Sequence, residues 1–84
     1  MAEPNPEGLL NLGMLSYEKQ GFSKARKYFE KACDLNNGGG CNGLGALYYN
    51  GEVVEKDLIK AAQFYSKACK LGVQEICESL KELR

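Results

Sequence analysis

The sequence has no histidine, no tryptophan and only two prolines among its 84 residues. Without histidine the chain lacks the most common general base and the most common metal ligand of proteins. It also lacks an excess of either charge, because 11 basic side chains balance 11 acidic ones. Since nucleic acids are bound by basic surfaces, we expect no nucleic-acid partner, and the composition offers no histidine-based catalytic site.

Long hydrophobic runs are absent too. No apolar stretch approaches the ~20 residues of a membrane-spanning helix, so no membrane partner is expected. No charged and then apolar leader begins at Met1, which fits either a cytosolic chain or one whose leader was removed. Four cysteines in so short a chain favour an oxidising compartment. We therefore expect a secreted or periplasmic protein, with the leader absent from this chain.

Apolar residues at spacings of three and four predict an all-α chain, and the signals of strands are missing. Asn5 is the expected N-cap of the first helix, with Pro6 at its first helical position. Ser23 and Asp57 are the expected caps of the second and fourth helices. A turn is expected at residues 36–40, where glycines can adopt left-handed backbone conformations without steric cost.

The chain also repeats itself. Residues 31–35, Lys-Ala-Cys-Asp-Leu, recur at residues 67–71 as Lys-Ala-Cys-Lys-Leu. In each copy a further cysteine follows eight positions after the cysteine of the motif, at Cys41 and Cys77. A fixed period of this length is typical of stacked helical hairpins.

We expect one domain, residues 1–84, that contains two hairpins at residues 5–36 and 37–72 and a capping helix at residues 73–84. Four extra residues distinguish the second hairpin loop from the first, which a surface loop of a repeat stack tolerates. A domain this short buries only ~60% of its surface on folding. A covalent brace would therefore contribute much of its stability.

Gly13 and Gly45 hold matching positions inside helices, where glycine costs about 1 kcal/mol relative to alanine. This cost is understandable if a neighbouring helix passes close by, with Phe29 packed over Gly13 and Tyr65 packed over Gly45. The aromatic residues at helical spacing are therefore expected in the core and not around a cofactor: Tyr28, Phe29, Tyr48, Phe64 and Tyr65.

A helix that ends near one cysteine and restarts near the next brings the two sulfurs together across the turn. This arrangement predicts the disulfides Cys33–Cys41 and Cys69–Cys77. A four-thiolate zinc site is an alternative, but zinc sites favour closely spaced pairs, and the two turns would lie about 10 Å apart by helix-packing distances. Buried, reduced thiols are the other alternative. We expect no metal and no cofactor.

The repeat motifs resemble known families. Leu-Gly in the first helix of each hairpin, with an aromatic residue and an alanine in the second helix, resembles tetratricopeptide repeats. Residues 41–51, Cys-Asn-Gly-Leu-Gly-Ala-Leu-Tyr-Tyr-Asn-Gly, followed by Lys-Ala-Ala-Gln-Phe-Tyr-Ser-Lys-Ala-Cys at residues 60–69, resemble a Sel1-like repeat. With its cysteine pairs the chain is similar to the Helicobacter cysteine-rich protein (Hcp) family. Members of that family carry more repeats, so this chain resembles a truncated or engineered minimal version.

The resemblance implies a right-handed α/α superhelix of two hairpins and a C-terminal capping helix. It also implies a concave groove lined by the first helix of each hairpin, which would bind a peptide or protein ligand. About half the usual groove is present, so we expect weak affinity, or self-association through the exposed end of the first helix. Carried over by position, the groove residues are Leu10, Met14, Tyr17, Glu18, Asn42, Ala46, Tyr49, Asn50 and Glu78. Packing between the hairpins is the alternative role for these side chains.

The resemblance further implies an alternative function, because the Hcp family has been linked to penicillin binding and slow β-lactam hydrolysis. Residues 16–19, Ser-Tyr-Glu-Lys, match the S-x-x-K element of serine β-lactamases. The S-D-N and K-T-G elements of those enzymes do not occur in this sequence. We therefore favour a disulfide-braced binding scaffold with no chemistry of its own, and we keep a penicillin-binding protein or weak β-lactamase as the alternative.

Overall fold

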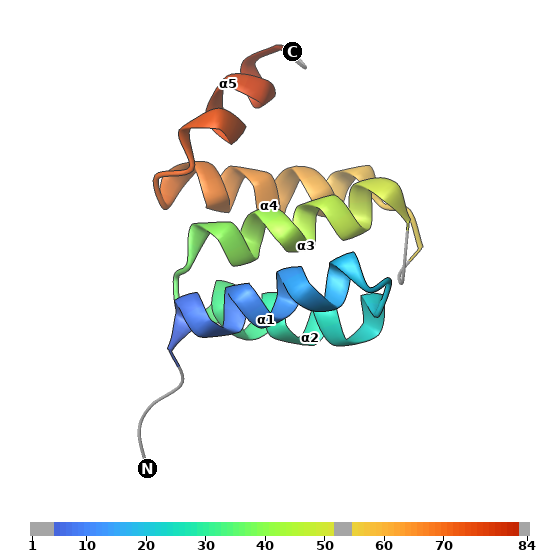
Figure 1. Ribbon diagram of the computed structural model, residues 1–84. Coiled ribbons are helices and arrows are strands. Elements are labelled where there is room, and N and C mark those ends of the chain that lie inside the picture. Colours follow the sequence, from blue (N-terminus) through green and yellow to red (C-terminus); the bar gives the residue numbers. More distant parts are fainter. Residues whose placement is uncertain (1–4, 52–54, 83–84) are drawn as a thin grey trace.

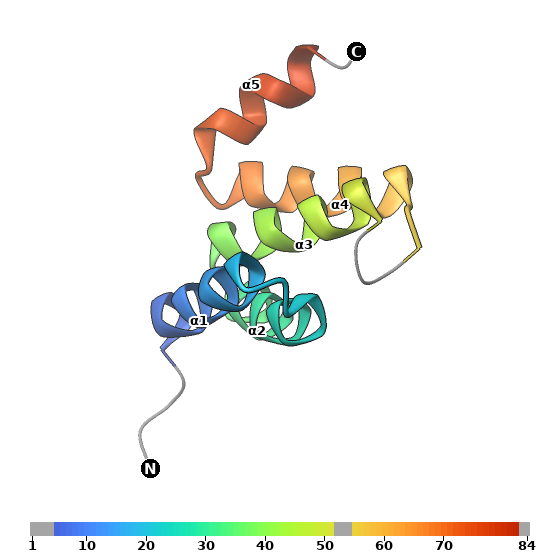
Figure 2. The same ribbon diagram turned by 45° about the vertical axis from the view of Figure 1, so that its right-hand side comes forward.

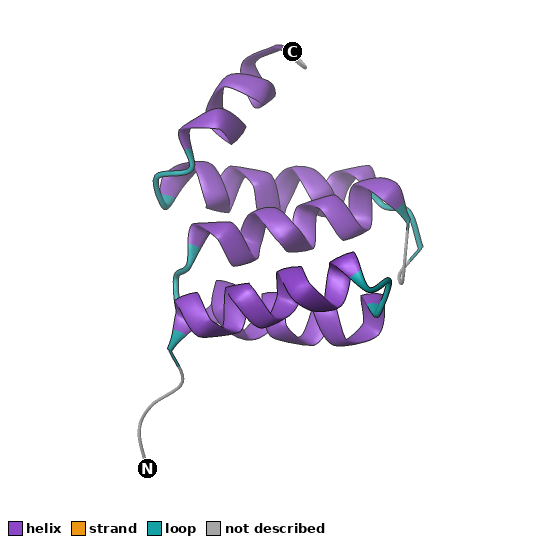
Figure 3. Ribbon diagram, in the orientation of Figure 1, coloured by secondary structure: helices purple, strands orange, loops and turns teal. Residues whose placement is uncertain are grey.

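A computed structural model describes residues 5–51 and 55–82 of the chain, with side chains up to residue 78. Within these residues the protein consists of helices and connecting turns, with no strand, which confirms the predicted all-α class (Figure 3). The helices are α1 (Pro6–Glu18), α2 (Phe22–Asp34), α3 (Gly38–Asn50), α4 (Leu58–Lys70) and α5 (Gln74–Glu82).

The helices pair into hairpins and the hairpins stack. Helices α1 and α2 form one antiparallel pair and α3 and α4 form the next (Figure 1). Helix α3 joins the two pairs because it packs against α2 and also against α1. Helix α5 packs on α4 and leads away from the stack at a steep angle, as the rotated view in Figure 2 also shows.

Local sequence signals determine where three of the helices begin. The side chain of Asn5 accepts a hydrogen bond from the backbone N–H of Glu7 at 2.9 Å, and Pro6 follows at the first helical position. The carboxylate of Asp57 accepts two hydrogen bonds at 3.0 Å, from the N–H groups of Ile59 and Lys60. Both predicted caps are confirmed. At the start of α3, the side chain of Asn37 accepts from the N–H of Gly40 in the same way.

The predicted cap at Ser23 is wrong. Helix α2 begins one residue earlier, at Phe22, and its N-cap Gly21 makes no side-chain capping bond. The reason lies in the preceding turn, where Gln20 takes a left-handed conformation with φ 62° and the N–H of Gly21 donates to the carbonyl of Ser16 at 2.7 Å. This Schellman closure of α1 turns the chain so tightly that α2 starts at once.

The prediction that glycines take the left-handed conformation in the turn between the hairpins is also wrong. The left-handed residue of that turn is Asn36, with φ 64°, and the Schellman bond runs from the N–H of Asn37 to the carbonyl of Ala32. Glycines 38–40 already belong to the first turn of α3. Their lack of a side chain serves close packing instead. A Cβ on Gly40 would lie only 2.8 Å from the backbone nitrogen of Cys33.

The two predicted glycine–aromatic contacts are confirmed. A Cβ on Gly13 would lie 2.6 Å from ring carbon Cε1 of Phe29, and one on Gly45 would lie 2.7 Å from Cδ1 of Tyr65. The ring of Phe29 also packs on Gly43 of α3, a contact that the repeat pattern did not reveal. In each hairpin, therefore, an aromatic ring of the second helix sits directly on the backbone of the first.

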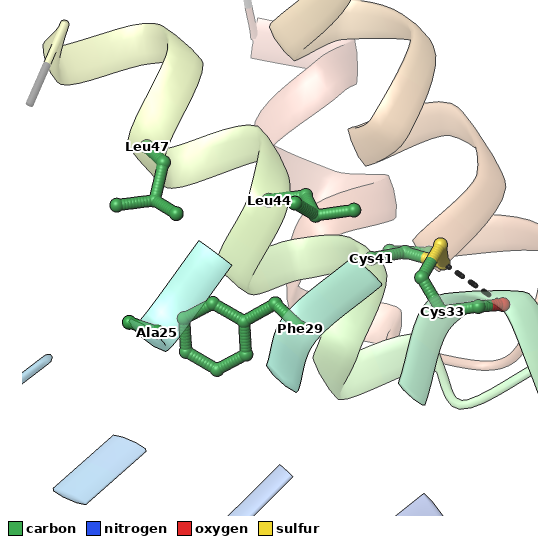
Figure 4. Packing of buried hydrophobic residues seen from close by; sticks show 7 residues of the cluster. Ala25, Phe29, Cys33, Cys41, Leu44 and Leu47 are labelled. Carbon is green, nitrogen blue, oxygen red and sulfur yellow. Dashed lines mark hydrogen bonds between the residues drawn. A yellow bond between two sulfur atoms is a disulfide. The ribbon is translucent and has the colours of Figure 1, made fainter. Parts of the chain in front are cut away.

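The buried core lies mainly between α2 and α3. Figure 4 shows Phe29 of α2 beneath Leu44 and Leu47 of α3. Of the aromatic residues that we expected in the core, Phe29 alone is fully buried, while Tyr28, Tyr48, Phe64 and Tyr65 are half-buried.

Two disulfides close the turns that follow α2 and α4. Cys33 is bonded to Cys41 and Cys69 to Cys77, and each pair is eight positions apart, as predicted. Since the sulfurs are joined to one another, they are not available as thiolate ligands for zinc. In Figure 4 a dashed line joins Cys41 Sγ to the carbonyl oxygen of Cys33 at 3.9 Å. A disulfide sulfur has no hydrogen to donate, so this is a packing contact.

Candidate functional site

Four of the nine predicted groove residues come together around one pocket. Met14, Tyr17 and Glu18 contribute one wall from α1, and Ala46 contributes the opposite wall from α3. The pocket has a volume of about 280 Å³. It lies where α1 and α3, the first helices of the two hairpins, approach one another.

The floor of this pocket consists of Phe29 and Gly43. Gly43 and Ala46 are adjacent on one face of α3 because they are three positions apart. Neither has a side chain large enough to fill the space between the helices, so the buried ring of Phe29 forms the bottom of the pocket. Aliphatic and aromatic groups thus form most of the pocket, with the carboxylate of Glu18 at its edge.

Sequence reasoning missed both floor residues. It assigned Phe29 to the core alone, and the ring is indeed 96% buried, since its exposed fraction is 4%. A signal for the hollow was nevertheless present. Two small residues, Gly43 and Ala46, at a spacing of three on a helix that faces its neighbour indicate a gap between the helices.

Leu10 belongs to the packing between the hairpins and not to the pocket wall. Its side chain packs against the buried core and is itself half-buried. A Cβ on Gly39 of α3 would lie 2.7 Å from Cδ2 of Leu10. Leu10 therefore sets the distance between α1 and the start of α3, which was the alternative role for the groove residues.

The remaining four predicted residues lie away from the pocket lining. Asn42 is half-buried on α3, and Asn50 is exposed at the end of that helix. Glu78 is exposed on α5, beyond α4. These positions require a longer concave surface than the single pocket between α1 and α3.

Tyr49 directly precedes Asn50 at the C-terminal end of α3 and is exposed over 47% of its surface. The ammonium group of Lys56 lies 6.0 Å from its ring centroid, within the range of a cation–π contact. Tyr49 also influences the half-buried Tyr65 of α4. Burial raises the pKa of the Tyr65 hydroxyl, and the nearby Tyr49 hydroxyl raises this pKa further.

The residues of the S-x-x-K element occupy a different part of the surface. Ser16 and Lys19 both line a hollow of about 560 Å³ between α1 and α2, outside the stack. The structure shows no group of three or more Cys, Asp or Glu side chains that could hold a metal ion within its described residues. None of the described helices is long and apolar enough to cross a membrane.

Comparison with known proteins identifies the repeat units. The Sel1 repeat family model matches residues 6–37 and 39–73. The first match contains α1 and α2, and the second contains α3 and α4. The two hairpins of the structure are therefore also the two units that the family model recognises.

Several known proteins contain related stretches. HcpC of Helicobacter pylori is 57% identical over 60 residues, which cover 71% of this chain and 21% of HcpC. HcpA of the same species, which is named a β-lactamase, is 53% identical over 64 residues, or 76% of this chain and 26% of HcpA. Cytochrome c oxidase assembly factor 7 of Xenopus tropicalis is 41% identical over 69 residues, or 74% of this chain and 30% of that protein. The chain thus spans less than a third of the length of each of these relatives.

Proposed function

This chain belongs to the Sel1 repeat family and is homologous to the Helicobacter Hcp proteins, and from that premise we propose that it is a scaffold that binds a peptide or protein segment between α1 and α3. The observation that carries the proposal is the convergence of Met14, Tyr17, Glu18 and Ala46 on one pocket. Repeat stacks of this kind present such concave surfaces to their partners.

The size of the pocket limits what it binds. A volume of about 280 Å³ is slightly below the range of about 300–1,000 Å³ that is typical of whole small-molecule sites. The pocket therefore suits one apolar side chain of a peptide, which would pack on Met14 and Phe29. Tyr17 supplies a rigid, amphipathic contact surface at the rim. Asn42, Tyr49, Asn50 and Glu78 would contact a longer ligand only where it continues along the stack.

The test is selection of binders from a random peptide library, followed by an amide chemical-shift titration of the selected peptide. We expect saturable shifts at Met14, Tyr17, Glu18 and Ala46. Ala46→Met would fill the pocket from α3 and reduce the affinity, whereas a substitution at the distant Gln63 on α4 would not. Tight binding with shifts that avoid α1 and α3 would refute the groove.

A weak β-lactam hydrolase or penicillin-binding protein is the second candidate, because HcpA carries the name of a β-lactamase and is 53% identical over the matched residues. Within this chain, Ser16 and Lys19 line the same hollow, and a serine nucleophile needs such a base within hydrogen-bond reach. The chain covers only 26% of HcpA. Turnover of nitrocefin that disappears in Ser16→Ala would favour this candidate over the scaffold.

We also propose that the chain acts as a single repeat domain and that its open end can associate with a second copy. Leu44 and Leu47 of α3 are 2% and 0% exposed, because α2 covers them. Their counterparts in α1, Leu12 and Leu15, are 46% and 53% exposed. Sedimentation over a range of concentrations tests this association, which Leu15→Lys would suppress.

The two disulfides indicate that the protein matures in an oxidising compartment. We propose that this compartment is the periplasm or the cell exterior. Mass spectrometry of the protein isolated from its native source, after thiols are blocked at the moment of lysis, tests the proposal. Free thiols at all four cysteines would contradict it.

A further inference from the structure

The hollow between α1 and α2 lies on a part of the surface that the proposed peptide groove does not use. Leu12, Leu15 and Ser16 line it from α1, and Lys24 and Tyr28 line it from α2. Its volume is about 560 Å³. The second hairpin has the same arrangement of helices. The residues at the matching positions between α3 and α4 therefore indicate which kind of side chain fits this hollow.

The two hairpins pack in the same register, which makes position-by-position comparison meaningful. Gly13 lies under Phe29 in the first hairpin just as Gly45 lies under Tyr65 in the second. The first helices therefore correspond with an offset of 32 residues, and the second helices correspond with an offset of 36. By these offsets Ser16 corresponds to Tyr48, Lys24 to Lys60, and Tyr28 to Phe64.

In the second hairpin the corresponding space is filled by the ring of Tyr48. This ring stacks on Phe64 with a centroid distance of 5.6 Å and an interplanar angle of 15°. The ammonium group of Lys60 lies 5.4 Å from the centroid of the same ring. The ring is thus held by an aromatic partner from α4 and by a cation, both of which are favourable contacts.

In the first hairpin the two groups that hold such a ring are present and the ring itself is missing. Tyr28 stands where Phe64 stands, and Lys24 stands where Lys60 stands. Ser16, however, replaces the tyrosine of the second hairpin and leaves the space open. The part of the hollow beside Ser16 and Tyr28 therefore corresponds to the space that the ring of Tyr48 fills in the second hairpin.

The positive charge around the hollow favours acidic residues on either side of the aromatic residue that binds there. Lys19 and Lys24 line it, and Lys24, Lys27 and Lys31 line an adjoining hollow that shares Tyr28. None of these four lysines is in an ion pair with an acidic side chain among the residues that the structure describes. A ligand with carboxylates beside its aromatic ring would therefore complement this surface.

We propose that the hollow between α1 and α2 is a second binding site, which takes a tyrosine or phenylalanine side chain from an acidic segment of a partner protein. The ring would lie between Ser16 and Tyr28, stacked on Tyr28 and with Lys24 at its face, as Tyr48 lies in the second hairpin. The flanking carboxylates of the partner would pair with Lys27 and Lys31. This site shares no residue with the pocket between α1 and α3, so it does not depend on the groove. It does include Leu12 and Leu15 of the proposed self-association surface, so it is a site of the monomer.

The experiment uses two soluble probes and one variant, Ser16→Tyr, in which the protein itself supplies the aromatic ring. The probes are p-cresol, which is the tyrosine side chain alone, and a short peptide with a central tyrosine among glutamates. In amide chemical-shift titrations we expect saturable shifts at Ser16, Lys24 and Tyr28, with the peptide binding more tightly than p-cresol. Ser16→Tyr introduces the ring that Tyr48 supplies in the second hairpin. It should lower the affinity for both probes by about tenfold or more, because the new side chain then occupies the site.

Three controls keep the result interpretable. A peptide with leucine in place of tyrosine should bind about tenfold more weakly, and Lys24→Gln should weaken the tyrosine peptide about threefold. Tyr28→Leu removes the stacking partner without adding bulk, and it should weaken binding even if Ser16→Tyr fails to fold. The proposal is overturned if neither probe shifts Ser16 and Tyr28, if the leucine peptide binds equally well, or if a folded Ser16→Tyr protein binds as the parent does.

Discussion

The backbone of Gly40 lies so close to that of Cys33 that a Cβ at position 40 would be 2.8 Å from the Cys33 nitrogen. The carbonyl oxygen of Phe29 would be 3.0 Å from the same Cβ. Helices α2 and α3 thus touch backbone to backbone at the point where the Cys33–Cys41 disulfide joins them. The disulfide and the close contact at Gly40 lie side by side, and the Cα atoms of the two cysteines are 4.7 Å apart.

Gly40→Ala is therefore expected to destabilise the protein. The added Cβ would meet the Cβ of Ala32 at 2.7 Å as well as backbone atoms of Cys33 and Phe29. None of these atoms can rotate away, so overpacking should cost about 1–3 kcal/mol. Alanine returns up to about 1 kcal/mol through its higher helix propensity, which leaves a net loss. Gly8→Ala is the matched control, because Gly8 holds the same repeat position in α1 and its Cβ would meet only the Cβ of Asn5, at 3.7 Å. Urea unfolding that shows equal changes for both variants would contradict the close contact.

A second matched pair measures what stacking contributes. Leu47 is fully buried between the hairpins, whereas Leu15, its counterpart in α1, is 53% exposed. Leu47→Ala should lower the free energy of unfolding by about 2–5 kcal/mol, since it leaves a cavity in the core. Leu15→Ala should change it by less than about 1 kcal/mol. The comparison is made by urea denaturation at low protein concentration, and a large effect of Leu15→Ala there would mean that α1 is covered by something other than a second copy.

The two disulfides are expected to differ in their resistance to reduction. Cys33 and Cys41 are buried, whereas Cys69 and Cys77 are half-buried at the junction with the terminal helix α5. A reductant reaches a sulfur only when it is exposed, so Cys69–Cys77 should open first under limiting reductant. Alkylation followed by mass spectrometry of the peptides reports the order. Simultaneous loss of both bonds would mean that reduction proceeds through global unfolding.

Each disulfide closes a loop of nine residues, from one cysteine to the other. By the chain-entropy estimate such a loop contributes about 2.6 kcal/mol. Replacing Cys33 and Cys41 by serine should cost more than replacing Cys69 and Cys77, because the first pair also places polar hydroxyls in the core. Both double variants should unfold at lower urea concentrations than the parent protein.

The sequence was informative where structure is determined locally. The caps at Asn5 and Asp57 depend on hydrogen bonds that reach only two or three residues along the chain, and the disulfide pairing depends on a single turn. The cap at Ser23 was mispredicted because the start of α2 is decided by the Schellman turn at Gln20 and Gly21. That turn starts the helix before Ser23, and the residue types alone do not show that it is more stable than a side-chain cap at Ser23.

The candidate sites depend on contacts between distant residues, and sequence alone predicted them in part. The resemblance to tetratricopeptide-like stacks supplied the groove positions of α1 and α3, and four of them line the pocket. It did not separate Leu10, which packs between hairpins, from Met14, which lines the pocket, because both lie on the same stripe of α1. The floor formed by Phe29 and Gly43 needs the distance between α2 and α3, and that distance is set by Gly40.

Alkaline pH is expected to weaken the protein through Tyr65. Its pKa in the folded state is raised above the ordinary value of 10.0, first by burial and then by Tyr49. Above pH 10 the unfolded chain therefore releases this proton while the folded protein still holds it, so the contribution of Tyr65 to stability is present below pH 10 and is lost as the pH rises through the folded pKa. Side-chain carbon NMR of the tyrosines should show Tyr65 titrating above the ordinary tyrosine pKa of 10.0. In Tyr49→Phe the pKa of Tyr65 should fall but remain raised, since burial is the larger cause, and a return to the ordinary value would mean that Tyr49 is the dominant influence.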